Sequence, residues 1–476
     1  EVSREGHLIK NTGILALGEF CPRFFTVLIT PILTSQLTKV EYGQYDLIIT
    51  ISSLLLPMAT LQISSAAFRF LINKRNDQEA CSEIISTIYL FILGMSLLSG
   101  ILYYLILGRF QRLIGVICPA YFVANILLIT TQQILRGKGN NLLYSICSII
   151  QAIVLLVLIM MLTSGAGTVN LGLLGVMISM LLASLVPTIV GVVHGNIISQ
   201  VNPKRFSVIV LKKLLAYSLP MVPNNLSSWV LTLSDRLVIT SFLGLEANAV
   251  YSVANKLPQI INSMQGTFVM AWQENASLAA EDSDKDTYYS RMCDWVYRLL
   301  TGVMAGLIMT TPVIWKILIR GEYSQAYFQL PVLYLGMMFS CMSSTLGGIY
   351  IAHMKTKSVG LTTMAAAAVN LMIDLLMINR IGIWAGSFST MISYFVLWLY
   401  RMIDIQRFQK VKIQVRTIVG SIVCLSVMAI ICFQDTPIFN IINVLLCCII
   451  LFVFDREIII FAIKEIKRRI QYAKRK

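Results

Sequence analysis

The residues of this chain that could do chemistry are the ionisable ones inside long apolar stretches. Glu19 and Arg23 stand at i,i+4 in one stretch, so on a helix the acid and the base share a face. Asp235 and Arg236 are adjacent in another stretch. Neighbours on a helix point about 100° apart, so these two need separate partners or water. Each such group in a bilayer costs several kcal/mol unless it is paired or wetted, so each is a candidate for binding or transport.

Further cations lie in or near apolar stretches. Lys256 closely precedes a proline that can bend its segment, and it could either neutralise Asp235 or add to a cationic cavity. Arg69 lies near a segment end, where snorkelling fits as well as function does. Arg298 follows Asp294 at i,i+4, which suits a structural pair or a cavity cation. The predicted cavity cations are Arg23, Arg69, Arg236, Lys256 and Arg298.

Carboxylates in the same stretches are candidates for coupling transport to an ion. A low dielectric disfavours the charged form of a carboxylate, which lets the group bind and release a proton or a cation. Each could instead be a fixed counter-ion, as in a static strut between Glu19 and Arg23. The predicted coupling residues are Glu19, Asp235, Glu274 and Asp374, with H⁺ or Na⁺ as the coupling ion.

The segments that carry these residues are those of a membrane protein. The chain is 57% hydrophobic and 13% charged, with a mean hydropathy of +0.76, whereas soluble domains are about 25% charged. Continuous apolar runs of about 20 residues predict helices that cross a bilayer. We therefore expect an all-α polytopic membrane protein with about fourteen spans. The spans are 8–36, 44–72, 83–107, 113–135, 141–163, 172–195, 212–243, 247–278, 291–318, 326–353, 358–379, 384–406, 413–433 and 438–463.

Two weak internal matches at nearly equal offsets indicate a repeat. Ser35, Leu37 and Tyr45 align with Ser241, Leu243 and Tyr251, while Leu171, Gly172, Leu173 and Ser179 align with Ile381, Gly382, Ile383 and Ser389. The repeat predicts two parallel halves of about 200 residues each around a central path. The expected domains are an N-terminal lobe at 1–195, a linker at 196–211, a C-terminal lobe at 212–408, and an extra helix pair with a basic tail at 409–476.

The lysines and arginines concentrate in alternate connecting segments, which predicts that both termini are cytoplasmic. This bias also accounts for most of the net charge of +15 without a nucleic-acid partner. The ten cysteines show no C-x-x-C spacing, and the three histidines are far apart. No Walker A or G-x-G-x-x-G pattern occurs, so we expect no nucleotide site, metal or other cofactor, and no catalytic residue.

Two segments carry a family resemblance. LPMVPNNLSSWVLTLSDRLVITSFLGLEANAVYSVANKLPQI, followed by AWQE at 271–274, is similar to the start of the C-terminal half of Wzx-type polysaccharide flippases. Residues 8–48, with EYGQYDLI at 41–48, resemble the N-terminal opening of that family. The pairs Asp235–Arg236 and Tyr251–Ser252 are its most specific points. Wzx proteins belong to the MATE-like multidrug/oligosaccharidyl-lipid/polysaccharide (MOP) superfamily.

The resemblance implies two six-helix lobes in a V in the bacterial inner membrane. It also implies a flippase that moves polyprenyl-diphosphate-linked oligosaccharide to the outer leaflet by alternating access, for surface polysaccharide. Membrane lipids and a polysaccharide polymerase or assembly protein would be its partners. A diphosphate requires cations, and arginine binds it bidentately. The alternatives are a MATE-like cation-coupled drug antiporter, a membrane enzyme such as a polymerase, and a channel or structural protein.

Overall fold

The computed structural model describes residues 4–72, 74–75, 77–107, 112–163, 171–412, 414–434 and 436–454. Within these ranges the chain forms α-helices, short 3-10 helices and connections, with no strand. All fourteen segments expected to span a membrane contain helix, although the part of the last one beyond Phe454 lies outside the described ranges. The predicted all-α polytopic fold is confirmed.

The helices fall in two compact units, one of residues 1–229 with 318–321 and the other of residues 230–317 with 322–476. The predicted lobe boundaries stay a prediction. The helices of unit 1 are α1 (Arg4–Gln36), α2 (Lys39–Thr60), α3 (Ile63–Ile72), α4 (Gln78–Leu107), α5 (Arg112–Gly137), α6 (Asn141–Thr163), α7 (Gly172–His194), η1 (Ile198–Gln200), η2 (Pro203–Arg205) and α8 (Val208–Ser218). Helix α9 (Met221–Leu243) crosses from unit 1 into unit 2.

Unit 2 contains the remaining helices. They are α10 (Leu245–Ala254), α11 (Lys256–Leu278), η3 (Ala279–Glu281), α12 (Lys285–Leu318), α13 (Ser324–Ala352), α14 (Thr356–Ile381), α15 (Trp384–Ile405), α16 (Val415–Cys432) and α17 (Pro437–Phe454). In the described residues, seven helices are long and apolar enough to cross a membrane: α4, α5, α6, α7, α12, α13 and α14. The pair α2–α3, bent by 53°, makes an eighth if it counts as one span.

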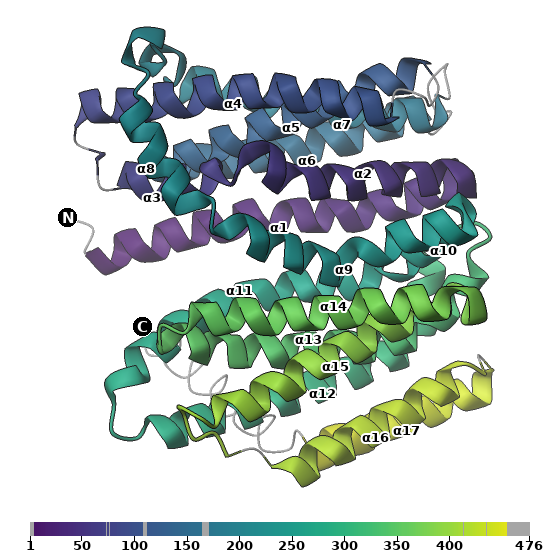
Figure 1. Ribbon diagram of the computed structural model, residues 1–476. Coiled ribbons are helices and arrows are strands. Elements are labelled where there is room, and N and C mark those ends of the chain that lie inside the picture. The colour runs from purple at the N-terminus through teal and green to yellow at the C-terminus, as the bar shows by residue number, and fades with distance from the viewer. Residues whose placement is uncertain are drawn as a thin grey trace, which may run out of the picture. The chain divides into compact units, whose positions relative to one another are not determined.

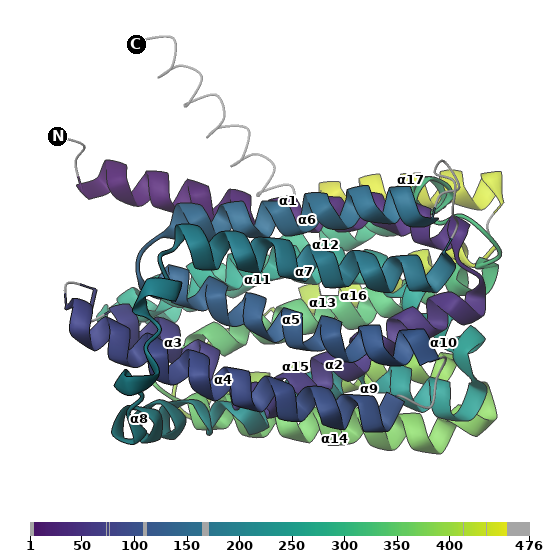
Figure 2. The same cartoon turned by 90° about the horizontal axis from the view of Figure 1, so that it is seen from above.

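Unit 1 packs its helices around α5, α6 and α7. Helix α6 lies against α1 and α7, and α5 lies against α4 and α7 (Figure 2). In the core, the ring of Tyr103 stacks on Phe122 with centroids 5.1 Å apart. The Tyr103 hydroxyl also forms a hydrogen bond of 2.9 Å with Ser52 Oγ. Where α2, α4 and α5 meet, the ring of Tyr103 thus packs against an aromatic ring while its hydroxyl group is hydrogen-bonded.

Unit 2 is built around α13, whose most apolar stretch is almost entirely buried inside the protein. Helices α10, α11, α15 and α16 pack against it, and α16 and α17 run side by side (Figure 1). Trp272 Nε1 on α11 donates to the Thr345 carbonyl of α13 at 2.7 Å. A Cβ at Gly348 would lie 2.5 Å from that indole, so only glycine fits there.

Each unit has a glycine with a positive φ where one helix begins, α7 in unit 1 and α15 in unit 2. Gly172 and Gly382, which the sequence repeat aligns, have φ of +50° and +60°. Both values are in the left-handed region that favours glycine. At Gly172 a Cβ would also lie 2.5 Å from Glu41 Oε1. That same oxygen accepts from the Leu173 amide at 3.4 Å and ties the start of α7 to that of α2.

Candidate functional site

Two carboxyl groups lie buried in the core of unit 2. Asp235 on α9 and Asp374 on α14 are each only 1% exposed. Two hydroxyls donate to Asp235 Oδ2, from Tyr251 on α10 at 2.5 Å and from Thr390 on α15 at 2.6 Å. One oxygen of Asp235 is therefore held by charge-assisted bonds from two different helices.

Asp374 is held far less completely. Asp235 and Ser389 lie beside its carboxyl group. Among the described residues, no hydrogen bond of good geometry reaches either Asp374 oxygen or Asp235 Oδ1, so Asp235 and Ser389 are polar neighbours within reach of Asp374 that do not hold it firmly. Two adjacent carboxylates that are removed from bulk solvent repel each other, so a shared proton or a bound cation between them would lower their energy.

Neutral oxygens complete the surroundings of the pair. Asn370, one turn before Asp374 on α14, accepts from Ser234 Oγ at 3.1 Å and donates to Ser389 Oγ at 3.3 Å. The Gly386 carbonyl accepts from the Tyr251 hydroxyl at 3.2 Å. Such a set of hard oxygens around negative charge suits H⁺ or Na⁺. Within the described ranges, no group of three or more His, Cys, Asp or Glu could hold a metal ion.

Glycine allows this close packing. A Cβ at Gly386 would lie 2.9 Å from the ring of Tyr251, so the helix α15 can approach α10 only with glycine at this position. The i,i+4 spacing of Asn370 and Asp374 places both on one face of α14. Four helices, α9, α10, α14 and α15, thus converge on one buried polar site.

The equivalent place in unit 1 has a different chemistry. The offset that aligns Tyr45 with Tyr251 aligns Asp235 with Ile29, and the offset that aligns Gly172 with Gly382 aligns Thr390 with Met180. Ile29 and Met180 are both buried. The carboxylate site is therefore a feature of unit 2 at these positions, and the repeat does not duplicate it.

The predicted cations have different environments. Arg236, which follows Asp235 on α9, is 4% exposed, while Arg23 on α1 and Lys256 at the start of α11 are half-buried. Arg69 near the end of α3 is exposed. Arg236 and Lys256 belong to unit 2, whereas Arg23 and Arg69 belong to unit 1. A common cavity for these side chains stays a prediction.

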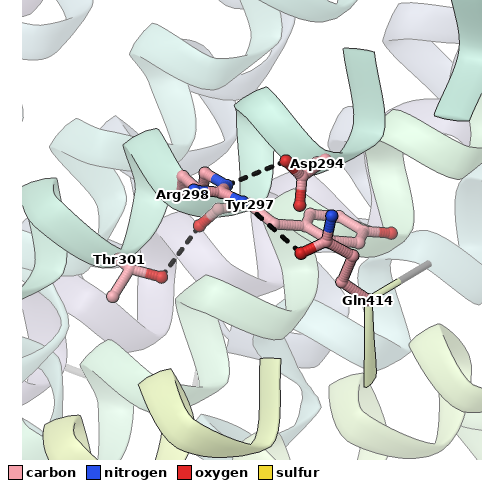
Figure 3. A network of polar contacts seen from close by, with 5 residues as sticks. All are labelled: Asp294, Tyr297, Arg298, Thr301 and Gln414. Carbon is pink, nitrogen blue, oxygen red and sulfur yellow. Dashed lines mark hydrogen bonds and ion pairs between the residues drawn. The ribbon is translucent and has the colours of Figure 1, made fainter. Parts of the chain in front are cut away.

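Arg298 lies in a network at the base of α16 (Figure 3). Its Nε donates to Asp294 Oδ2 at 2.8 Å, as the i,i+4 spacing suggested. Its Nη2 donates to Gln414 Oε1 at 3.4 Å, directly before α16 begins. This geometry joins α12 to the C-terminal helix pair, and a role of Arg298 in a substrate cavity stays untested.

The structure gives less support for ion coupling by the other two candidates, Glu274 and Glu19. Glu274 is exposed on α11. Glu19 lies on α1, but its side chain is outside what the structure describes, so the Glu19–Arg23 pair stays a prediction. The structure therefore brings together two of the predicted coupling residues, Asp235 and Asp374.

Sequence reasoning missed Arg401 as an intramembrane group, because it lies at the predicted cytoplasmic end of a span. It is 5% exposed on α15. It donates to the Ser343 carbonyl at 2.9 Å and to the Thr362 and Thr363 hydroxyls at 3.1 Å each. Through these neutral acceptors on α13 and α14, Arg401 on α15 links three helices by hydrogen bonds.

The fold is that of known flippases and transporters. A structure of the lipid II flippase MurJ in an inward-closed conformation superposes with a TM-score of 0.68 at 17% identity, covering 94% of this chain and 99% of that one. An inward-facing multidrug resistance MATE transporter of the MOP superfamily gives 0.63 at 14%, covering 83% and 95%. These structural relatives are a flippase and a transporter, and their likeness to this chain shows a shared fold.

Sequence comparisons give the family. An uncharacterized membrane protein of Methanocaldococcus jannaschii is 24% identical over 233 residues. The match spans 46% of this chain and 45% of that relative, so the chain covers about half the relative's length. The model of the polysaccharide biosynthesis protein family matches residues 8–272, more than half of the chain. This multi-pass membrane protein therefore belongs to the polysaccharide biosynthesis protein family.

Proposed function

We propose that this chain is a cation-coupled flippase that moves polyprenyl-diphosphate-linked oligosaccharides from the cytoplasmic to the outer leaflet of a bacterial inner membrane. The family match and the MOP fold support a flippase for polysaccharide synthesis. The observation that carries the coupling is the buried pair of Asp235 and Asp374, whose carboxyl groups lie beside each other in the core of unit 2.

The pair has the properties that coupling needs. A permanently charged, unfilled site would cost several kcal/mol per ion in this core. Binding H⁺ or Na⁺ removes that cost, so the occupied and unoccupied states differ strongly in energy. The ligands come from α9, α10, α14 and α15, so a change in occupancy favours a different packing of these helices. A ligand shifts a conformational equilibrium only through such differential binding.

The negative charge of the proposed substrate suggests a role for the buried and half-buried cationic side chains. A diphosphate crossing the bilayer needs a cationic, wet path, and Arg236, Arg23 and Lys256 are the side chains we propose for it. Arginine is favoured over lysine where two phosphate oxygens are held at once. A MATE-like drug antiporter would share the carboxylate site, but the match to the polysaccharide biosynthesis family favours the lipid-linked sugar.

The orientation follows from the basic segments, with both termini in the cytoplasm, where lipid-linked repeat units are assembled. The product would then reach the outer leaflet, where a polymerase or assembly protein would take it. No nucleic acid has a role in this proposal.

The experiment is a flipping assay with purified protein in vesicles that contain a fluorescent polyprenyl-diphosphate oligosaccharide. A membrane-impermeant quencher reports the leaflet of the sugar, under an imposed Na⁺ or pH gradient. Wild-type protein should flip the lipid faster with a gradient, and Asp374→Asn should lose this acceleration. The matched control is Glu246→Gln, at an exposed position on α10 that is not a coupling candidate, and this variant should behave as wild type. Transport of cationic drugs in place of the lipid would support the antiporter.

A further inference from the structure

Helix α8 runs across the long helices of unit 1 and not along them. It crosses α3 and α4 at an angle (Figure 1), and it is seen nearly end-on where α4 lies lengthwise (Figure 2). A break at Leu219 and Pro220 separates α8 from α9, so residues 212–218 are not the first turns of a straight span, as the sequence predicted. With 11 residues, α8 is about 16 Å long and too short to cross a bilayer.

Hydrogen bonds from α4 hold the segment that leads into α8. Ser82 and Ser86 both donate to the Gln200 carbonyl, at 2.7 and 3.0 Å. The Thr87 hydroxyl accepts from the Ser207 amide at 3.1 Å. Ser207 is also the N-cap of α8. The start of α8 therefore has a fixed position on α4.

Helix α8 lies beside α3 and α4 and not beyond their ends. Its Tyr217 ring contacts Phe70 of α3, with centroids 6.0 Å apart, and the bond to Thr87 fixes its start on α4. Both contacts lie within about three helical turns of the loop that carries Lys74 and Arg75. This loop is one of the basic segments that predict the cytoplasmic side. The outer face of α8 is therefore at the level of the lipid headgroups on that side.

One face of α8 packs on unit 1 and the opposite face is exposed. Leu214 and Ser218 are fully buried. Successive residues of a helix point about 100° apart, which places Ile209 and Ala216 on the side away from these two. Ile209 is 69% exposed, and Ala216 is exposed beside it. The outer face of α8 thus has an apolar centre.

Two lysines border this apolar centre. On the same helical projection, Lys212 lies about 60° to one side of Ile209 and Lys213 about 40° to the other, and both lysines are exposed. An apolar stripe bordered by lysines is typical of a helix that lies in the plane of a membrane interface. The spanning helix α4 contains no lysine or arginine, so its exposed apolar residues have no such border.

Two further cations lie just before α8, in η2. Lys204 and Arg205 are both exposed, and Arg205 forms an ion pair of 3.6 Å with Glu79 of α4. Among the residues that the structure describes, no salt bridge reaches Lys204, Lys212 or Lys213. These three lysines are therefore available to an anionic partner outside the chain.

We propose that α8 is an interfacial anchor that binds anionic phospholipids of the cytoplasmic leaflet. Ile209 and Ala216 contact the upper parts of the acyl chains, while Lys212 and Lys213 bind headgroup phosphates on either side. A flexible lysine with a compact charge suits headgroups that exchange and move. The proposal does not depend on which substrate the protein transports.

The test is photo-crosslinking to lipid in vesicles that contain the purified full-length chain with equal amounts of phosphatidylglycerol and phosphatidylcholine. A photoreactive amino acid replaces Ile209, and mass spectrometry of the protein identifies the lipid in each adduct. We expect at least roughly fivefold more adduct with phosphatidylglycerol, which is the effect of one lysine near an anionic lipid surface. Met161 on α6 is the control position, because it is 60% exposed on a helix without lysine or arginine, and it should give nearly equal amounts.

Charge variants test the role of the lysines. Lys212→Gln combined with Lys213→Gln should bring the two adducts at position 209 close to equal amounts. Lys357→Gln combined with Lys410→Gln, at exposed positions in unit 2, should leave the preference unchanged. If the first double variant folds poorly, high salt should weaken the preference of the chain with its lysines intact, because salt screens exposed charges. Equal adducts with the lysines present, a preference insensitive to both their removal and salt, or adducts with a second protein chain in place of lipid would each overturn the proposal.

Discussion

Asp374→Asn should abolish the stabilisation of this protein by its coupling ion. A cation that binds the folded protein at a hundred times its dissociation constant stabilises it by about 2.7 kcal/mol. The oxygens that can take up the cation are both oxygens of Asp374 and Oδ1 of Asp235, because no hydrogen bond of good geometry holds them within the described ranges. With asparagine at 374 the site keeps one carboxylate, already held by Tyr251 and Thr390. The cation-dependent stabilisation should then fall close to zero.

The same variant should be at least as stable as wild type when no cation is bound. Two unit charges 4 Å apart repel by about 4 kcal/mol at an effective dielectric constant of 20, which sets the upper scale for the two carboxylates. Asparagine has nearly the same shape, removes one charge, and can donate a hydrogen bond to the neighbouring Asp235. Loss of ion response without loss of fold is the expected signature.

The assay is thermal unfolding of purified protein, followed by tryptophan fluorescence. Na⁺ is titrated against choline at constant ionic strength, and protons are titrated in a separate series. Glu246→Gln should keep the wild-type response, because Glu246 is exposed and is not a coupling candidate. A full ion response in Asp374→Asn, or a wild-type protein that responds to neither ion, would refute the coupling role.

Three further changes test how the core holds the site. Tyr251→Phe removes the hydroxyl that donates to Asp235 and should cost about 1.5–3 kcal/mol in denaturation, as for hydrogen bonds to charged groups; an unchanged midpoint would contradict this bond. Gly348→Ala places a Cβ 2.5 Å from the Trp272 indole and should reduce the yield of folded protein, whereas Gly306→Ala, with open space around it, should not. Arg401→Met leaves the acceptors on α13 and α14 without their donor and should lower the unfolding temperature. An unchanged unfolding temperature would show that the hydrogen bonds of Arg401 do not contribute to stability.

The sequence predicted the helices well because the bilayer imposes length and apolarity on each of them. It also identified Asp235 and Asp374 separately, since a carboxylate in an apolar stretch is rare and costly. Their pairing depends on how α9 and α14 pack, and no spacing along the chain encodes that contact. Asn370, at i,i+4 from Asp374, was the local signal that could have marked the site.

Two arginines show the limit of reading charge from position alone. Arg298 was expected either in a structural pair or in a cavity, and its contacts run to Asp294 and to Gln414 before α16. Arg401 is near the end of the predicted span 384–406, where a basic residue would be expected to reach water, yet it lies buried between α13, α14 and α15. The acceptors of Arg401 are on other helices and far away in sequence, whereas Arg298 keeps its i,i+4 partner Asp294 and adds one distant contact, to Gln414.

The central claim is that Asp235 and Asp374 couple an ion to the flipping of a lipid-linked oligosaccharide. The most direct measurement records both events in the same vesicles, with a quencher for the lipid and an ion-sensitive dye for H⁺ or Na⁺. Wild-type protein should move the ion only when the lipid-linked sugar is present, and Asp374→Asn should show no substrate-dependent ion movement. Flipping by wild type without any ion movement, or unchanged coupled movement in Asp374→Asn, would contradict the account.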